Sequence, residues 1–247
     1  MRILFIGDSI TRGKLGVSYI QLIKKEFPAY ELVNLGVDGD TFSNISRRLQ
    51  TKIEQDSEFD YIVLQGGYND IFLPYFREKS KLFQFALKQQ LKKGLVPLET
   101  APAFEAELRK IVKTVKQKFR GKLVVTTIGC INEFRGFVLN SKRKEYNTII
   151  RHVAQEENIG LADCGLLFDQ VLQQELQTNY FLESFWTVTV ADRIISVFKN
   201  GPDWLSQKRK LKLTIDGVHL NKKGAALVKK SLLPNLSLPE RKAKLVV

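Results

Sequence analysis

The chain has 247 residues, of which 44% are apolar, so it can bury one large core and form one or two domains. No stretch is long and apolar enough to span a bilayer, and the first residues do not form a secretory signal, so we expect a cytoplasmic protein. The net charge of +13 favours anionic partners. The same charge can also come from basic residues on the solvated faces of ordinary amphipathic helices, and we prefer this interpretation.

Short apolar runs rich in β-branched residues alternate with longer amphipathic stretches along the chain. The runs predict buried parallel strands at residues 3–6, 32–35, 61–64, 123–128 and 159–162. Apolar residues at helical spacing predict helices at residues 19–27, 104–119 and 141–157. This alternation predicts a doubly wound α/β sheet, in which sites form at the carboxyl ends of the strands.

Residues 166–212 fit this alternation least well. The segment is long for a connection and contains both tryptophans, Trp186 and Trp204. Extra helices that cover the sheet are the commoner arrangement, and a lid over the substrate site is the alternative. We therefore expect residues 1–247 to form a single domain that carries a helical insertion or lid over residues 166–212.

The cysteines and the first histidine point to structural roles. Cys130 and Cys164 follow or end strand-like runs and form no C-x-x-C motif, which predicts buried free thiols rather than a zinc site. His152 lies in the middle of a predicted amphipathic helix, away from any loop at a strand end, so we assign it a structural or solvent role. His219 is the only other histidine and is therefore the candidate base.

The first predicted strand runs into Gly7-Asp8-Ser9. Gly7 allows a tight turn, and Ser9 then lies on the turn that leads into the first helix. A serine in this place is commonly a helix N-cap. It can also be a nucleophile, provided that a base takes the proton from its hydroxyl.

Asp216 and His219 are three residues apart near the end of the chain. This spacing lets the carboxylate reach Nδ1 of the imidazole and leaves Nε2 free to face Ser9. A serine, a histidine and a carboxylate in that relation form a triad of nucleophile, base and orienting group.

Two further loops follow the second and third predicted strands. The N–H of Gly36 could point at a substrate oxygen, or Gly36 could belong to a plain glycine-rich turn. Asn69 could donate from its amide, or it could cap the helix that begins near Ile71, a role that Asp70 could also fill. With the N–H of Ser9, these donors would form an oxyanion hole for a tetrahedral intermediate.

These four blocks, taken in order, resemble the SGNH hydrolases, also called GDSL esterases. The family is named for four residues that are matched here by Ser9, Gly36, Asn69 and His219. The blocks read Gly7-Asp8-Ser9-Ile10-Thr11, Asn34-x-Gly36-x-x-Gly39-x-Thr41, Gly67-x-Asn69-Asp70 and Asp216-x-x-His219. The resemblance extends from residue 1 to about residue 233.

The resemblance implies a three-layer α/β/α sandwich of flavodoxin-like type with a five-stranded parallel sheet. It implies Ser9 as nucleophile, His219 as base and Asp216 as orienting group, with oxyanion donors from Ser9, Gly36 and Asn69. It implies no metal and no cofactor.

The ester is less well defined than the reaction. A small acyl group, such as an O-acetyl group on a sugar, is one candidate, and a longer acyl chain on a lysophospholipid or thioester is the other. Two aromatic groups could line an acyl groove or could belong to the core, which is commoner: Phe72, Tyr75 and Phe76, and Phe181, Phe185 and Trp186. The expected substrate is a small-molecule ester or a glycan or lipid ester. The basic charge slightly favours an anionic substrate or carrier, and the oligomeric state stays open.

A non-catalytic module that binds anions or nucleic acid is the rival interpretation. The chain contains neither G-x-G-x-x-G nor G-x-x-x-x-G-K-[ST], and this interpretation leaves Asp216 and His219 without a role. We therefore expect an ester hydrolase and do not expect nucleic acid as a partner.

Overall fold

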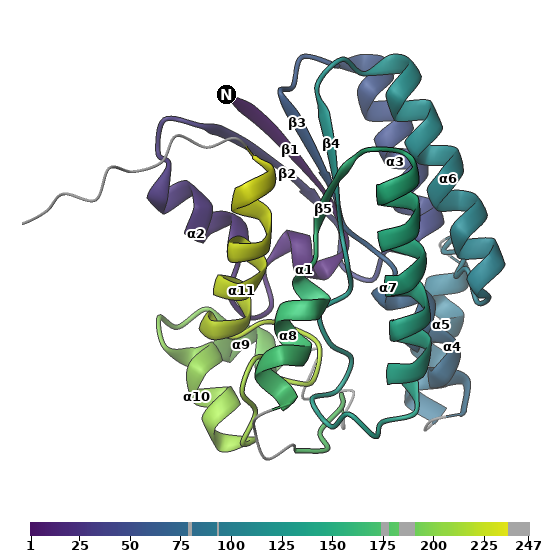
Figure 1. Cartoon of the computed structure of the whole chain (residues 1–247). Coiled ribbons are helices and arrows are strands. Elements are labelled where there is room, and N and C mark those ends of the chain that lie inside the picture. Colours follow the sequence, from purple (N-terminus) through teal and green to yellow (C-terminus); the bar gives the residue numbers. More distant parts are fainter. Residues whose placement is uncertain (79–80, 93, 174–177, 183–190, 237–247) are drawn as a thin grey trace, which may run out of the picture.

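The computed structural model describes all residues except 79–80, 93, 174–177, 183–190 and 237–247 (Figure 1). Its centre is a parallel sheet with the strand order β2-β1-β3-β4-β5. The strands are β1 (Arg2–Gly7), β2 (Glu31–Gly36), β3 (Tyr61–Leu64), β4 (Lys122–Thr126) and β5 (Gly160–Ala162). All five strands were predicted from their apolar runs, and the order is that of flavodoxin-like sheets.

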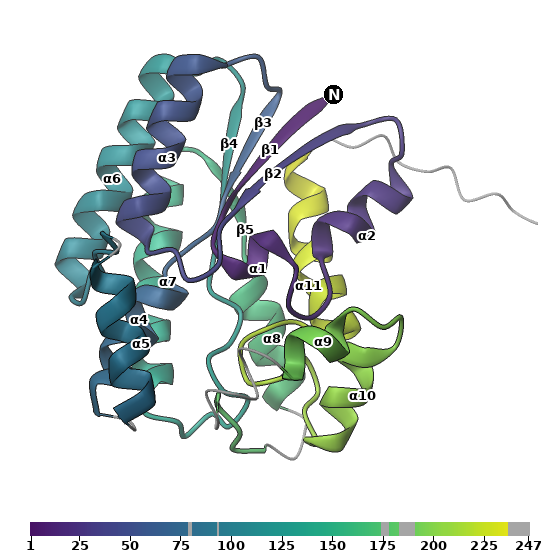
Figure 2. The ribbon, with the colours of Figure 1, turned by 180° about the vertical axis from the view of Figure 1, so that it is seen from behind.

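Helices cover both faces of this sheet and make it the middle of three layers (Figures 1 and 2). One face carries α3 (Phe42–Gln55), α6 (Ala101–Lys118) and α7 (Leu139–Glu156). The other face carries α2 (Tyr19–Glu26), α8 (Cys164–Gln173) and α11 (Lys222–Leu232). The helices predicted at 19–27, 104–119 and 141–157 are confirmed as α2, α6 and α7. Helix α3 was missed, although Phe42, Ile45, Leu49 and Ile53 follow its buried face at helical spacing.

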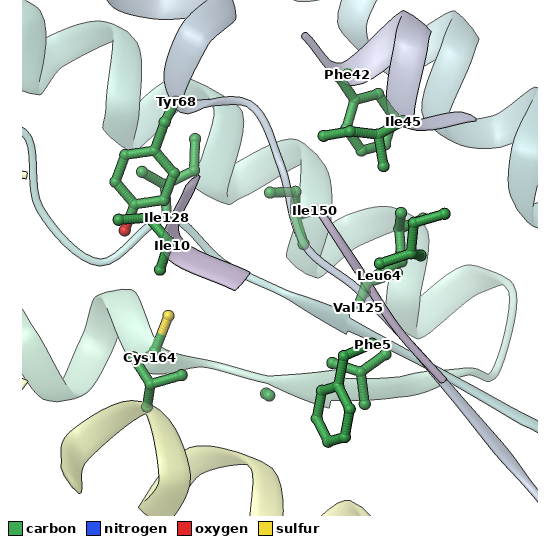
Figure 3. Close-up of a cluster of buried hydrophobic side chains, with 14 of the residues drawn as sticks. Phe5, Ile10, Phe42, Ile45, Leu64, Tyr68, Val125, Ile128, Ile150 and Cys164 are labelled. Carbon is green, nitrogen blue, oxygen red and sulfur yellow. The ribbon is translucent and has the colours of Figure 1, made fainter. Parts of the chain in front are cut away.

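The core lies between the sheet and these helices. Figure 3 shows strand side chains such as Phe5, Leu64 and Val125 together with Ile45 and Ile150 from the helices, all of them almost fully buried. Each such side chain contributes about 1.5–3 kcal/mol through its removal from water. A core of this size holds the strand ends in fixed relative positions.

Aromatic rings join the helices on the α3 side of the sheet. The ring of Phe104 in α6 lies 4.8 Å from the ring of Phe42 in α3 and stacks at 4.3 Å on Tyr146 in α7. The cysteines are buried and free, as predicted, and His152 is 60% exposed beside Glu156 on α7.

Further helices gather beyond the carboxyl ends of the strands. They are α1 (Ser9–Arg12), α4 (Tyr68–Tyr75), α5 (Lys81–Lys92), α9 (Asp192–Ser196) and α10 (Gly201–Lys208). Helices α9 and α10 fall within the segment 166–212, where extra helices were expected. Trp204 lies in α10, whereas Phe185 and Trp186 lie outside the described residues. A lid function for this segment stays a prediction.

The sheet topology places the candidate residues at one edge. Strand β1 pairs with β2 on one side and with β3 on the other, so the chain reverses its direction of winding around β1. A crevice forms at such a reversal, outside the carboxyl ends of the strands. The ends of β1, β2 and β3 all lie at this edge, and Ser9, Gly36 and Asn69 are found at these ends or within a few residues beyond them.

Candidate active site

Ser9 is the first residue of α1, directly beyond the end of β1. The N-cap is Asp8, whose carboxylate accepts a hydrogen bond of 2.9 Å from the N–H of Ile10. The amide of Gln65 donates to the same carboxylate at 3.0 Å, and burial raises the pKa of Asp8 to about 6. Asp8 therefore does the capping, and the hydroxyl of Ser9 is left for another partner.

That partner is His219, 210 residues further along the chain. The Nε2 atom of His219 lies 3.1 Å from Oγ of Ser9, and its Nδ1 lies 2.6 Å from Oδ2 of Asp216. A proton on Nδ1 then bonds to the carboxylate, and Nε2 accepts the hydroxyl proton of Ser9. The three predicted residues thus lie in one hydrogen-bonded line.

The loop that carries this pair is fixed by its own backbone. Oδ1 of Asp216 accepts the N–H groups of Val218 and His219, at 3.0 and 2.8 Å. The N–H of Ile215 donates to the carbonyl oxygen of His219 at 2.7 Å. The carboxylate therefore orients both the imidazole and the turn that presents it.

Burial and charge act against each other on this pair. Burial lowers the pKa of the His219 imidazole, but the charge of Asp216 and the hydrogen bond to it outweigh burial and raise that pKa above its usual value. Burial raises the pKa of Asp216, and the charge and hydrogen bond of His219 reverse this effect and lower it. Asp216 is therefore ionised at neutral pH, and His219 is a stronger base than a free imidazole.

Asn69 lies in the first turn of α4 and does not cap that helix. The N-cap of α4 is Gly67, and the amide of Asn69 donates at 2.8 Å to the carbonyl oxygen of Asp40, beyond β2. Asp70 does not cap α4 either, because its carboxylate accepts the N–H groups of Phe42 and Leu98. Both side chains instead tie α4 to neighbouring segments, and the second N–H of the Asn69 amide has no hydrogen-bond partner within the described part of the chain.

Gly36 differs from the prediction. Its N–H donates to Oδ1 of Asn34 at 2.9 Å, so this group is already engaged and does not point at a substrate oxygen. A Cβ at this position would lie 2.1 Å from the backbone nitrogen of Arg12. Gly36 is therefore needed because α1 packs closely against the end of β2.

Gly39 has the properties that were expected of Gly36. It has a φ of +76°, which glycine adopts without strain, and a Cβ there would meet no atom within 4 Å. Among the described residues, no hydrogen bond engages its N–H. It precedes Asp40, whose carbonyl oxygen holds the amide of Asn69.

Glu133 was not singled out in the sequence and is buried next to the loop that carries Asp216 and His219, called here the Asp216–His219 loop. Its Oε1 accepts the N–H groups of Leu213 and Thr214, each at 2.8 Å, and the hydroxyl of Thr214 at 2.7 Å. Its Oε2 accepts the N–H of Lys212 at 2.6 Å. One carboxylate thus holds the strand-like segment that leads into Asp216.

The aromatic residues after Asn69 pack against one another. Phe181 is buried, and its ring lies 5.0–6.4 Å from four neighbours: Phe72, Tyr75, Phe76 and Phe137. The N–H of the next residue, Leu182, donates to the carbonyl oxygen of Asp216 at 3.1 Å. This cluster is part of the core, and the residue that follows it is hydrogen-bonded to the Asp216–His219 loop.

A sequence model of the GDSL-like lipase/acylhydrolase family matches residues 5–227. No curated protein matches the chain in sequence.

Solved structures with the same fold share about a fifth of their residues with this chain. An alpha/beta hydrolase enzyme from the metagenome of Lake Arreo, Spain, has 20% identity and a TM-score of 0.62, over 95% of this chain and 94% of its own. An acetyl xylan esterase has 20% identity and a TM-score of 0.62, over 95% and 98%. An acetylxylan esterase from Geobacillus stearothermophilus has 19% identity and a TM-score of 0.58, over 96% and 94%.

The family match extends from β1 to α11 and therefore includes both Ser9 and His219. The solved structures share the fold of this chain. The chain belongs to the GDSL-like lipase/acylhydrolase family and is a carboxylic ester hydrolase.

Proposed function

We propose that this hydrolase works through a triad of Ser9, His219 and Asp216 and forms an acyl-enzyme. The observation that carries the proposal is the line of hydrogen bonds from Asp216 through His219 to Ser9, at 2.6 and 3.1 Å. Neither Ser9 nor His219 is used for helix capping or for packing in the core. A buried imidazole paired with a carboxylate and a hydroxyl is the arrangement that activates a serine.

The reaction follows from this geometry. Ser9 Oγ attacks the ester carbonyl carbon while Nε2 of His219 takes the hydroxyl proton, and Asp216 stabilises the imidazolium that forms. The tetrahedral intermediate collapses as His219 gives this proton to the leaving alcohol, which leaves an acyl group on Ser9. Water then attacks the acyl-enzyme with the same base, and the carboxylic acid and free Ser9 are released.

The oxyanion of the tetrahedral intermediate needs hydrogen-bond donors close to Ser9. We assign this role to the N–H of Ser9, the free N–H of the Asn69 amide and the N–H of Gly39, which takes the place first expected for Gly36. The hydrogen bond from Asn69 to Asp40 supports this assignment, because it holds the amide next to the Gly39 turn. The loss of one such donor typically reduces kcat by about 10²–10³.

For the substrate we propose an ester with a small acyl group, of which an O-acetyl group on a glycan is the leading candidate. Two of the solved structures that share the fold are acetyl xylan esterases. The packed state of Phe72, Phe76 and Phe181 also supports a small acyl group, because these rings fill space that a long chain would need. A lysophospholipid or thioester with a longer chain is the alternative, and the basic surface slightly favours an anionic substrate.

No described helix is long and apolar enough to cross a membrane. We infer a cytoplasmic location, which is in keeping with the free thiols of Cys130 and Cys164.

Hydrolysis of p-nitrophenyl acetate tests the proposal. The wild-type protein should hydrolyse the ester with a burst of p-nitrophenol, and Ser9→Ala should reduce the rate to background. Acetyl, butyryl and longer p-nitrophenyl esters, compared by kcat/KM, identify the acyl length. Equal turnover by Ser9→Ala would refute the nucleophile, and a preference for long chains would favour the lipid alternative.

A further inference from the structure

The face formed by α9, α10 and the turn between them exposes large apolar side chains. The exposed fractions are 59% for Ile194, 83% for Val197, 66% for Phe198 and 50% for Trp204. Isolated exposed apolar residues are common on protein surfaces, but these four lie within eleven residues, on two helices that contact each other and on the turn between them. We call these four residues the α9–α10 apolar face.

The surroundings of this face are basic. The exposed cations over residues 191–212 are Arg193, whose guanidinium pairs with Asp38 at 3.1 Å, and Lys199, Lys208, Lys210 and Lys212. The acidic groups in the same range are withdrawn, because Asp192 is fully buried against Arg209 and half-buried Asp203 accepts the N–H of Lys222. The Nζ of Lys208 lies 5.0 Å from the ring of Trp204, so a cation borders the apolar side chains directly.

Helix α10, which carries Trp204, and the adjacent Arg209 contact the Asp216–His219 loop and the residues before it. Leu205 packs with Leu15 and Ile215, and the Ser206 hydroxyl donates to the carbonyl oxygen of Thr214 at 2.6 Å. Arg209 donates to the carbonyl oxygen of Ile215, also at 2.6 Å, one residue before Asp216. Figures 1 and 2 show α9 and α10 beyond the carboxyl ends of the strands, on the side where α1 lies.

The geometry points to a docking surface for an anionic lipid bilayer. We infer that Val197, Phe198 and Trp204 enter the interfacial region while the cations around them contact lipid phosphates. Aliphatic and aromatic side chains bordered by lysines are typical of segments that lie in a membrane interface. This inference does not depend on the proposed substrate or triad.

Two other occupants fit the same observations less well. Interfaces between proteins are depleted in lysine, whereas here lysines border the apolar side chains. A second copy of the chain would bring two molecules of net charge +13 together through their basic faces. An anionic bilayer satisfies both the apolar and the cationic groups.

Co-sedimentation of the full-length protein with lipid vesicles tests the inference. The wild-type protein should bind vesicles made of equal parts of phosphatidylcholine and phosphatidylglycerol more tightly than vesicles of phosphatidylcholine alone, and this binding should weaken as the salt concentration rises. The double variant Val197→Glu/Phe198→Glu should bind the anionic vesicles about tenfold more weakly or worse, since it loses two interfacial side chains and gains two negative charges. The double variant Lys199→Glu/Lys208→Glu should lose binding in the same way.

A matched control changes exposed apolar residues elsewhere. Phe85 and Val138 are 62% and 65% exposed, and Phe85→Glu/Val138→Glu should bind the anionic vesicles as the wild type does. Hydrolysis of p-nitrophenyl acetate without vesicles should stay unchanged in the Val197→Glu/Phe198→Glu variant, so the chemistry is followed separately. Equal binding to neutral vesicles, equal loss in the control, or a dimer that only Val197→Glu/Phe198→Glu abolishes would overturn the inference.

Discussion

Glu133 should determine both the stability of the Asp216–His219 loop and the rate of the reaction. The perturbation is Glu133→Ala, which removes the acceptor for three backbone N–H groups and one hydroxyl in a buried place. Each buried N–H without a partner costs about 1–3 kcal/mol, so the variant should lose about 3 kcal/mol or more of its free energy of unfolding. Glu133→Gln keeps one oxygen for the Leu213 and Thr214 groups and turns an amide toward the N–H of Lys212, so it should lose only about 1–3 kcal/mol.

The kinetic effect follows from the place of this segment in the chain. Residues 212–214 lead directly into Asp216, and Thr214 pairs with Leu220 across the loop. A displacement of about 1 Å in a catalytic group can reduce the rate about 100-fold. The kcat of Glu133→Ala should therefore fall strongly while KM changes little, and Glu133→Gln should recover much of the loss.

Urea unfolding and steady-state hydrolysis of p-nitrophenyl acetate measure the two effects. Glu99→Ala is the matched control, because this glutamate forms a half-exposed ion pair with Arg77 and should contribute less than about 1 kcal/mol. If Glu133→Ala unfolds within about 1 kcal/mol of the wild type, or keeps its full kcat, the carboxylate does not hold the loop and the reasoning fails.

Four other variants test the remaining parts of the site. The pKa of His219 is raised and the base must be neutral, so wild-type activity should decrease as the pH is lowered through a midpoint above 6.5. Asp216→Asn should move that midpoint to lower pH and reduce kcat about 10⁴-fold. A midpoint that does not move in the pH–rate profile would argue against the pairing of His219 with Asp216. Gly36→Ala should drive α1 away from β2, lower the free energy of unfolding by about 1–3 kcal/mol and reduce activity. Gly39→Ala should lower the free energy of unfolding by about 1–2 kcal/mol, from its positive φ alone. Urea unfolding that shows the reverse order of the two losses would contradict both assignments. Burial raises the pKa of Asp70 to about 7, so between the ordinary pKa of an aspartate and that value the folded state binds a proton that the unfolded state does not. The free energy of unfolding should therefore fall as the pH rises through this window, by about 4 kcal/mol at most. Thermal unfolding of Asp70→Asn should show a flatter pH dependence than that of the wild type.

The sequence alone determined the elements whose signals are local. Apolar runs predicted the five strands, and helical spacing predicted α2, α6 and α7. These predictions were possible because the spacing of residues on a buried face can be recognised within one short stretch of sequence. The blocks around Ser9 and His219 were also found in this way, since each is short and begins or ends at a recognisable strand or turn. Their side chains meet because parallel strands and the final helix all bring their loops to one edge of the sheet.

Only the tertiary structure decided which groups near these blocks are free and which are engaged. Gly36 was selected for an open N–H, but a hydrogen bond to Asn34 and the close approach of Arg12 give it a structural role. Asp70 looked like a local helix cap, and its carboxylate instead holds Phe42, 28 residues away. Glu133 left no local signal, because the backbone groups that it holds lie 79–81 residues further along the chain. Hydrogen bonds between distant segments depend on how helices pack on the sheet, and that packing is not encoded in any single stretch of residues.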